Sequence, residues 1–401
     1  MILQGNYSLS LRLGEDDINV PIDSLKNFVI VQDIDRLIPS FKLGLSDPQG
    51  AMAHFLAPDK QVRTITVESG KGVERDESWN TFKFIMSRRK PQEGFGISSI
   101  CYLVGLSAVP SLLDVRKSRG WAGSVKDALT SIALEELMVD EVDISPSLDG
   151  EQLMIQDYCT TAEFLYDLKQ RLEGLTGVAG YRCFIKNYKN KQVFVCRSLE
   201  ELCQGAVVQT FVVSDVDKQI KGFDADALPA YSYSVMDNYQ VLSTPQVDYE
   251  YFDYDSSEFV SAYETVDDFY SLSQYLLIDR GDLYGVGYVG YLGRNSAVTE
   301  DFSGDARAYY YDRLINLVQL WILVPGMINM CPGDVVKVFF PFSVQIGSTH
   351  LCQHSGFWLI KRVVHMFGHT HRTRLLLVRA GIDTGAETSL VPASKYKVDR
   401  Q

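Results

Sequence analysis

Short stretches of alternating apolar and polar residues follow one another from residue 7 to about residue 112. In a half-buried strand, successive side chains point to opposite faces, so this alternation is typical of β-structure. Turn-forming residues separate the stretches, which favours a barrel or a sandwich. The six expected strands are YSLSLRL, KNFVIVQDI, SFKLGLS, QVRTITVE, TFKFIMSRR and ISSICYLVGLSAV.

The apolar residues change to helical spacing after this region, in segments 124–137 and 160–174. Ser124 occupies the N-cap position of the first expected helix. In the second, Thr160 and a glutamate three residues later form a capping-box pattern, and Gly174 is a candidate helix end. The pattern predicts two amphipathic helices.

A β-hairpin is expected next, over residues 180–196 with its turn near Asn190. It places Cys183 opposite Cys196, where a disulfide and a pair of packed thiols both remain open and packing is favoured. The chain has seven cysteines and no CxxC pair, which predicts reduced thiols and folding in a cytoplasm. Helices and hairpin together predict a small α/β unit over residues 113–205.

The most acidic part of the chain follows a further pair of expected strands. Between Asp248 and Asp301 the sequence has twelve acidic and two basic residues. Acids and tyrosines interleave over residues 248–255, which is close to the alternation of a half-buried strand. The segment GVGYVG at 285–290 lacks the helix that a dinucleotide-binding site requires, so a glycine-spaced strand or turn is favoured.

The charge balance excludes one class of function and the hydropathy another. With 51 acidic and 38 basic residues the net charge is −13, which argues against a protein whose main surface grips nucleic acid. The longest apolar run, LVQLWILVPG, is interrupted by Gln319 and ends at Pro325. It is shorter than the ~20 residues that span a bilayer, so no membrane insertion is expected. The first residues do not form a signal peptide.

Five of the six histidines lie between residues 350 and 371, which raises the possibility of a metal site. His365, His369 and His371 are the candidate ligands, but their spacing suits zinc only on a helix. Residues 357–367 have the pattern of a strand, so His365 is expected to pack in the barrel. His369 and His371 are expected in a turn. We therefore predict no metal, no cofactor and no catalytic residues.

The C-terminal part places a Tyr-rich helix, DARAYYYDRLINL, before a run of strands, and Pro332-Gly333 is expected to make a tight reversal between two of them. In these features the chain resembles the baseplate or tail hub proteins of phages. That family is related to the base of the type VI secretion spike and to late-control tail proteins. The features that carry the resemblance are the PGD turn, the strand with Trp358 that ends in Val364-His365, and the final strand RTRLLLVRAG.

The resemblance implies an α+β fold that is mostly β, with two tail-tube-like antiparallel β-barrels. It assigns residues 1–112 to the first barrel, and residues 206–243 with 318–381 to the second. The α/β domain would be 113–205, and the acidic Tyr-rich insert 244–317.

The resemblance also implies a structural, non-enzymatic role in the virion. A homotrimer would join the sixfold tail tube to the threefold central spike, contact baseplate wedge or neighbouring tail proteins, and form part of a channel that DNA passes without specific binding. Given the net charge, the wall of that channel is expected to be acidic.

The last residues, 382–401, are polar and without periodicity, and we expect an extended arm that contacts the spike. Leu390, Val391 and Tyr396 are its candidate contacts. Two alternative functions remain open: a zinc-dependent tail-tip cell-wall hydrolase using the histidines, and a carbohydrate-binding module, because tyrosines stack on sugars.

Overall fold

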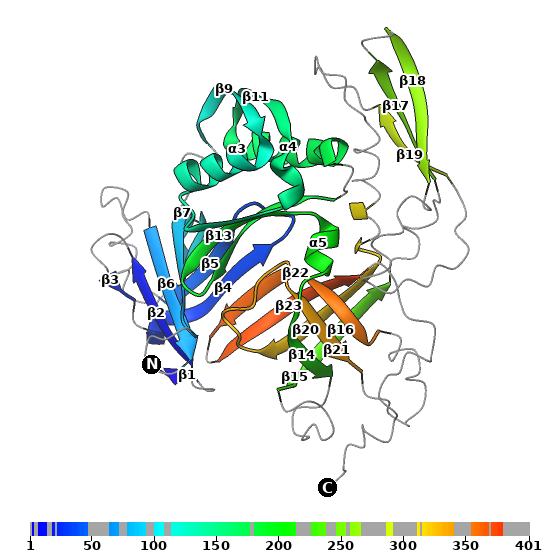
Figure 1. Cartoon of the computed structure of the whole chain (residues 1–401). Coiled ribbons are helices and arrows are strands. Elements are labelled where there is room, and N and C mark those ends of the chain that lie inside the picture. The colour runs from blue at the N-terminus through cyan, green and yellow to red at the C-terminus, as the bar shows by residue number, and fades with distance from the viewer. Residues whose placement is uncertain are drawn as a thin grey trace.

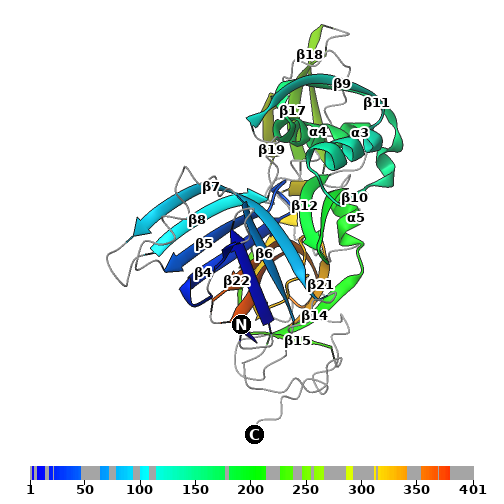
Figure 2. The same ribbon diagram turned by 90° about the vertical axis from the view of Figure 1, so that its left-hand side faces the viewer.

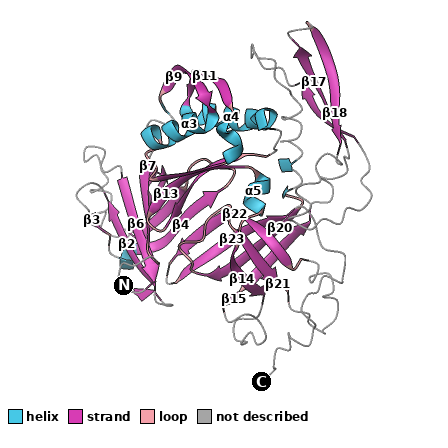
Figure 3. Ribbon diagram, viewed as in Figure 1, coloured by secondary structure: helices cyan, strands magenta, loops and turns pink. Residues whose placement is uncertain are grey.

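The structure is a computed structural model that is mostly β-sheet, with its longer helices gathered in one region (Figures 1 and 3). Among the described residues, no helix is long and apolar enough to cross a membrane. The residues that the structure describes are 2–3, 7–13, 18–20, 22–46, 64–71, 78–93, 100–107, 114–176, 180–213, 226–237, 246–253, 257–265, 286–291, 311–312, 315–340, 354–368 and 370–379.

The first barrel is a curled antiparallel sheet with the strand order β2-β6-β7-β8-β5-β4 (Figure 2). Each of the six expected segments forms one of its strands, so that prediction is confirmed. Alternate residues point inward, and Phe28, Leu43 and Phe82 are fully buried in its core. The elements are β1 (Ile2–Leu3), β2 (Tyr7–Leu13), β3 (Ile18–Asn19), η1 (Ile22–Ser24), β4 (Leu25–Asp33), β5 (Ser40–Ser46), β6 (Thr64–Lys71), β7 (Asn80–Glu93) and β8 (Ile100–Ser107).

The α/β unit follows, and both expected helix caps are present. The Ser124 hydroxyl accepts the Asp127 N–H at 3.4 Å. Thr160 and Glu163 exchange bonds, with Glu163 N–H to Thr160 Oγ1 at 3.2 Å and Thr160 N–H to Glu163 Oε2 at 2.8 Å. The elements are β9 (Arg116–Ser124), α3 (Val125–Ser131), the π-helix η4 (Ile132–Glu136), β10 (Glu141–Ile144), η5 (Pro146–Asp149), β11 (Glu151–Thr160), α4 (Thr161–Thr176), β12 (Arg182–Tyr188), β13 (Lys191–Arg197) and α5 (Leu199–Cys203).

One boundary in this unit was wrong. Gly174 does not end α4, which continues to Thr176. Cys183 and Cys196 do face each other in the β12–β13 register, with their sulfurs 3.3 Å apart. Both are buried free thiols, so of the two alternatives for this pair the packed thiols are the ones found.

The second barrel closes on itself. Its strands are β14 (Val207–Val213), β15 (Leu228–Ala230), β16 (Ser232–Asp237), β20 (Val318–Pro325), β21 (Val335–Phe339), β22 (Gly356–Phe367) and β23 (His371–Arg379). β15 pairs with β14, and β16, one residue further on, pairs with β20. The order is therefore β14-β21-β22-β23-β20-β16, with β15 returning to β14.

The two barrels share one strand order. With the short strands β1, β3 and β15 left out and the other six numbered along the chain within each barrel, the order is first, fourth, fifth, sixth, third, second in both cases. One orientation differs: β2 is antiparallel to β6, whereas the corresponding β14 is parallel to β21 and also to β15. The two barrels are thus repeats of one design, and the second has an opposite first strand.

The barrels are joined edge to edge into a single sheet of fifteen strands. The long strand β22 pairs with β23 along one edge. Along its other edge, its first residues pair with β21 and its last six, from Arg362 to Phe367, pair with Asp33 to Phe28 of β4. The pairing with β23 has a register shift between Ile360 and Arg362, where the partner on the other edge changes from β21 to β4.

A separate sheet forms in the acidic region, from β17 (Gln246–Asp253), β18 (Glu258–Thr265) and β19 (Val286–Tyr291), seen side by side in Figure 1. The expected strand at 248–255 is β17, although Tyr254 and Asp255 lie outside the described residues. GVGYVG forms most of β19 and is a strand, as favoured. Of the Tyr-rich segment 305–317, only 311–312 and 315–317 are described, of which 311, 312 and 315 are helical.

Candidate functional site at the junction of the barrels

The β12–β13 hairpin lies where the α/β unit meets both barrels. On the first-barrel side, the Asn187 N–H donates to Gln32 Oε1 in β4 at 2.9 Å, and its side-chain amide donates to the Thr81 carbonyl at 3.1 Å. The Ile185 N–H donates to the Leu37 carbonyl at 2.8 Å. These bonds satisfy buried backbone groups, so the position of the hairpin on the first barrel is closely specified.

Asn80, the first residue of β7, recognises the backbone of the hairpin turn. It is fully buried. Its Nδ2 donates to the Asn187 carbonyl at 2.9 Å, and its Oδ1 accepts the Asn190 N–H at 3.2 Å. Lys189 and Asn190 form the turn with φ of 47° and 64°, the left-handed conformation of a two-residue hairpin loop. One side chain therefore holds both sides of this turn.

The second barrel also contacts the hairpin at Asn187. The Cys331 thiol donates to the Asn187 carbonyl at 3.3 Å, so this one oxygen accepts a bond from each barrel. Burial raises the pKa of Cys331 well above its ordinary value, which keeps the thiol protonated as a donor. The Ile34 N–H also donates to the Lys361 carbonyl at 3.0 Å, directly between barrels.

A cluster of charged side chains lies at the other end of β12. Arg182 is 2% exposed, and its guanidinium lies 3.0 Å from Asp35 and forms a second ion pair with Asp312. Lys361 of β22 lies 2.7 Å from the other oxygen of Asp35. Burial opposes ionisation of Asp35, but Arg182 and Lys361 outweigh it and lower its pKa. Arg182 is thus a buried cation whose two carboxylate partners are 38% and 53% exposed.

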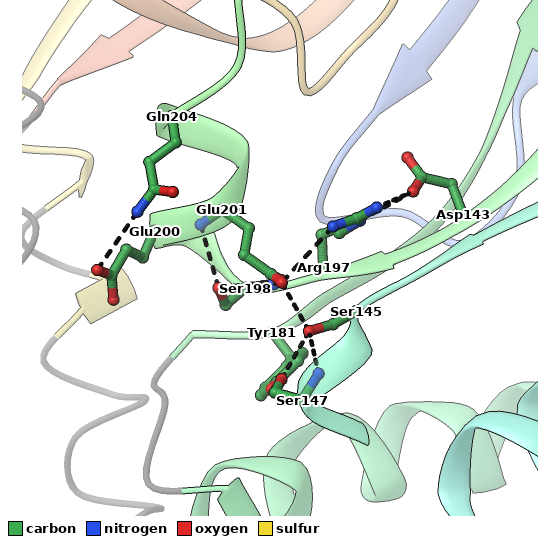
Figure 4. Close-up of polar contacts among 9 residues, drawn as sticks. All are labelled: Asp143, Ser145, Ser147, Tyr181, Arg197, Ser198, Glu200, Glu201 and Gln204. Carbon is green, nitrogen blue, oxygen red and sulfur yellow. Dashed lines mark hydrogen bonds and ion pairs between the residues drawn. The ribbon is translucent and has the colours of Figure 1, made fainter. Parts of the chain in front are cut away.

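Figure 4 shows the polar contacts that hold α5 against the rest of the α/β unit. Ser198 and Glu201 form a capping box: the Ser198 Oγ accepts the Glu201 N–H at 3.1 Å, and Glu201 Oε2 accepts the Ser198 N–H at 3.0 Å. The other oxygen of Glu201 accepts the Ser145 hydroxyl at 2.7 Å. Ser147 and Tyr181 exchange a hydroxyl bond of 2.6 Å beside it. Glu201 thus ties the start of α5 to the chain before η5.

The Pro332-Gly333 turn packs against both α5 and the hairpin. Gly333 has φ +86°. A Cβ on it would lie 2.9 Å from the Phe184 ring and 3.3 Å from a methyl of Leu202. The expected turn is present between β20 and β21, but these two strands do not pair with each other. β20 pairs with β16 and β23, and β21 with β14 and β22, so the turn leads into β21 from a strand that is not its neighbour.

We expect Gly333→Val to lower the free energy of unfolding by about 1–3 kcal/mol, because the left-handed conformation is unfavourable for a β-branched residue and its side chain meets Phe184. Pro332→Ala, the matched change one residue away, should cost less than about 1 kcal/mol and act mainly through the unfolded chain. Urea titrations of both variants would measure this. Equal midpoints for wild type and Gly333→Val would contradict the role of this turn.

Of the candidate metal ligands, His365 and His371 are buried and His369 lies outside the described residues. Their rings are 5.7 Å apart, and His365 Nδ1 lies 3.4 Å from the Thr373 hydroxyl. Burial lowers the pKa of His365 to about 3 and that of His371 well below its ordinary value, so both are neutral. No group of three or more metal-ligating side chains is found among the described residues.

Trp358, a further residue expected to be structural, is fully buried in the second barrel. Its indole N–H donates to the His354 carbonyl at 3.0 Å, and the Arg379 guanidinium lies 4.2 Å from the ring centre. The candidate spike contacts Leu390, Val391 and Tyr396 lie outside the described residues.

The sequence analysis missed the residues that make the junction. Gln32 and Asn80 continue the inward-facing positions of their strands, in register with Phe28 and Phe82. A polar residue at a core position is the signal that points to a buried hydrogen-bonding partner.

No protein-family model and no curated protein sequence matches the chain. The structure, however, is similar to solved structures over nearly its whole length. A 43 kDa tail protein of prophage MuSo2 from Shewanella oneidensis has a TM-score of 0.61 and 11% identity, with 94% of this chain and 100% of that chain covered. A tail protein from Neisseria meningitidis has a TM-score of 0.58 and 14% identity, with 94% and 98% covered.

A component of the Escherichia coli type VI secretion system is also similar, with a TM-score of 0.50 and 9% identity over 92% of this chain and 76% of that one. It is itself described as structurally similar to bacteriophage tail proteins. At such identities the similarity establishes the fold. The mostly β fold with tail-tube-like barrels is therefore confirmed, and at the level of the fold so is the resemblance to phage tail proteins.

Proposed function

We propose that the chain is a structural hub of a phage-type tail baseplate. In this role a homotrimer joins the sixfold tail tube to the threefold central spike and forms part of the DNA channel. The observation that carries the proposal is the repeated strand order: three chains with two like barrels each present six like barrels. The similarity to phage tail proteins and to a type VI secretion component supports it.

The junction supports the same role. An adaptor that meets a sixfold ring must hold its two barrels at one fixed angle, and a single sheet through β4 and β22 does this. The bonds of Asn80 and Cys331 to one carbonyl add further constraints. The protein would act in the virion, beside the tube protein, the spike and the neighbouring baseplate proteins.

The mass of the full chain in solution tests the proposal. We expect a trimer of three times 45.1 kDa by light scattering, and rings with six-lobed projections by negative-stain microscopy. A chain that stays monomeric at high concentration, both alone and with tail tube protein, would contradict the adaptor role.

We further propose that residues 382–401 contact the spike, through anchors at Leu390, Val391 and Tyr396. A chain ending at Ala380 should keep the melting temperature and oligomeric mass of the full chain. It should be recovered with the spike protein in co-purification at no more than about a tenth of the full-length yield. The matched variant, with these three anchors changed to Ser in the full chain, should behave like the truncation. Undiminished recovery of either would remove the arm from the interface.

Neither alternative function has a supporting observation in the described part of the chain. The two described candidate ligands, His365 and His371, are buried, and no group of three metal-ligating side chains includes them among the described residues. Elemental analysis of the purified protein separates the cases, because one zinc per chain would favour the tail-tip hydrolase. A glycan array tests the carbohydrate-binding alternative, because an array that shows no binding would weaken it.

A further inference from the structure

One face of the fifteen-stranded sheet is continuous across both barrels. It is the face opposite the cores, and pairing registers define it because directly paired residues point to the same side. One row crosses six adjacent strands, with every step given by the register. From β7 to β23 it consists of Arg88, Val104, Lys42, Val29, Met366 and Arg372. At ~4.8 Å per strand the row is about 24 Å wide.

The charged side chains on this face are nearly all basic. Five exposed bases, which we call the basic face, are Lys42, Lys83, Arg88, Arg372 and Arg374. Among the described side chains of β4, β5, β6, β7, β8, β22 and β23, the only carboxylates are Asp33 and Glu68, and each pairs with an arginine, at 2.5 and 2.7 Å. Excess positive charge is thus concentrated here in a chain of net charge −13.

Aromatic rings support two of the bases. The Arg374 guanidinium lies 4.4 Å from the Trp321 ring centre, and the Lys42 ammonium lies 5.6 Å from that of Tyr102. A cation held over a ring keeps its N–H groups free for an anion and loses less side-chain freedom on binding. These bases are therefore placed to meet a partner.

We propose that the basic face contacts the phosphate backbone of double-stranded DNA. This inference rests on the proposed function, in which DNA passes the hub. It replaces the acidic channel wall expected from the net charge, because the register gathers the bases on one wall while the acids lie elsewhere. Apolar residues separate the bases along the row, so contacts are few and evenly spread. Binding would be weak and independent of sequence, as a sliding polymer requires.

The same charges favour DNA over an acidic protein. Protein interfaces depend on a packed apolar core with few lysines, whereas Lys42 and Lys83 are both exposed here. A polyanion longer than the row can reach Arg88, Lys42 and Arg372, which the register places on one face. The row also offers no acidic partner for the bases of a second protein.

Fluorescence anisotropy of a labelled 24-base-pair duplex, titrated with the full chain at 25–200 mM salt, tests the proposal. With about four phosphate contacts, log affinity should fall with log salt with a slope of about −3.6. The double variant Lys42→Glu/Arg372→Glu should bind at least about tenfold more weakly at 50 mM salt. The slope of its log affinity against log salt should be shallower, at about −2. The milder pair Lys42→Gln/Arg372→Gln should lie between the two, and it serves if the charge reversal does not fold.

The matched control is Lys126→Glu/Lys191→Glu, which makes the same charge change at side chains that are 41% and 55% exposed on α3 and β13. It should change the affinity by less than about twofold. Equal losses in both variants, or no wild-type binding at 25 mM salt, would overturn the proposal. So would a basic-face variant with an altered oligomeric mass, since the face would then contact protein. A wild-type trimer that does not bind DNA would refute this inference and leave the hub proposal intact.

Discussion

Replacing Asn80 by alanine should lower the free energy of unfolding by about 2–4 kcal/mol. The change removes the donor to the Asn187 carbonyl and the acceptor of the Asn190 N–H. A backbone group that loses its partner in a buried site costs ~1–3 kcal/mol, and here two such groups are affected. The Cys331 thiol remains on the Asn187 carbonyl, but a thiol is a weak donor and recovers little of the loss.

The matched control is Asn27→Ala, an exposed asparagine on β4 of the same barrel, which should change stability by less than about 0.5 kcal/mol. Urea unfolding of the full chain, followed by tryptophan fluorescence, measures both. Because Asn80 connects the first barrel to the hairpin, its loss should also increase amide exchange at Asn187 and Asn190. A stability loss equal to that of Asn27→Ala would mean that the junction does not depend on this side chain.

The strands of the first barrel were predictable because each alternates cleanly about a one-sided core. Leu9 and Leu11 in β2, and Phe41, Leu43 and Leu45 in β5, occupy every second position and are all buried. The helix caps were predictable for a similar reason, since Ser124 and the Thr160 pair act within four residues. Strands and helix caps are predictable because both depend on residues that are close together in the sequence.

The arrangement of the strands was not predictable in this way. The pairing of β4 with β22 joins residues such as Asp33 and Arg362, which are hundreds of positions apart, and no periodicity specifies an edge. The Pro332-Gly333 turn shows the limit clearly. Its chemistry identified a left-handed glycine, but the strand that precedes it is not the strand that pairs with β21.

The site was partly encoded at single positions. Gln32 in VIVQD and Asn80, which precedes two inward-facing phenylalanines, are polar residues at core positions. A search for apolar periodicity alone treats such residues as exceptions and overlooks them. Arg182 carries the same signal, because it lies between Tyr181 and Cys183 and all three are buried. Their partners, the backbone of the hairpin and Asp35, come from other units. The position of a junction residue can therefore be predicted from the sequence, whereas its hydrogen-bonding partner is known only from the fold.

His365 should make the protein sensitive to mild acid. Its pKa is about 3 in the fold because burial disfavours the charged ring, whereas it is about 6.5 in the unfolded chain. At pH 8 both states are neutral, so this residue adds no pH dependence. As the pH falls below about 6.5, the unfolded chain binds a proton that the folded chain excludes. The free energy of unfolding then falls by ~1.4 kcal/mol per pH unit, until about pH 3.

Replacing His365 by phenylalanine should remove this dependence, because the ring lies among Phe82, Phe367 and His371 and an apolar ring suits that environment. Loss of the Thr373 contact shifts stability equally at every pH. Between pH 8 and pH 5, the difference in unfolding free energy should move by about 2 kcal/mol in favour of the variant. The carboxylates titrate alike in wild type and variant, so their contributions cancel in the difference between the two unfolding free energies. His371, whose pKa burial also lowers, leaves the variant a residual slope of the same sign, which His365→Phe/His371→Phe should remove. Parallel stability curves for wild type and the single variant would show that the pKa of His365 in the fold is close to its value in the unfolded chain, and would contradict the burial of its ring.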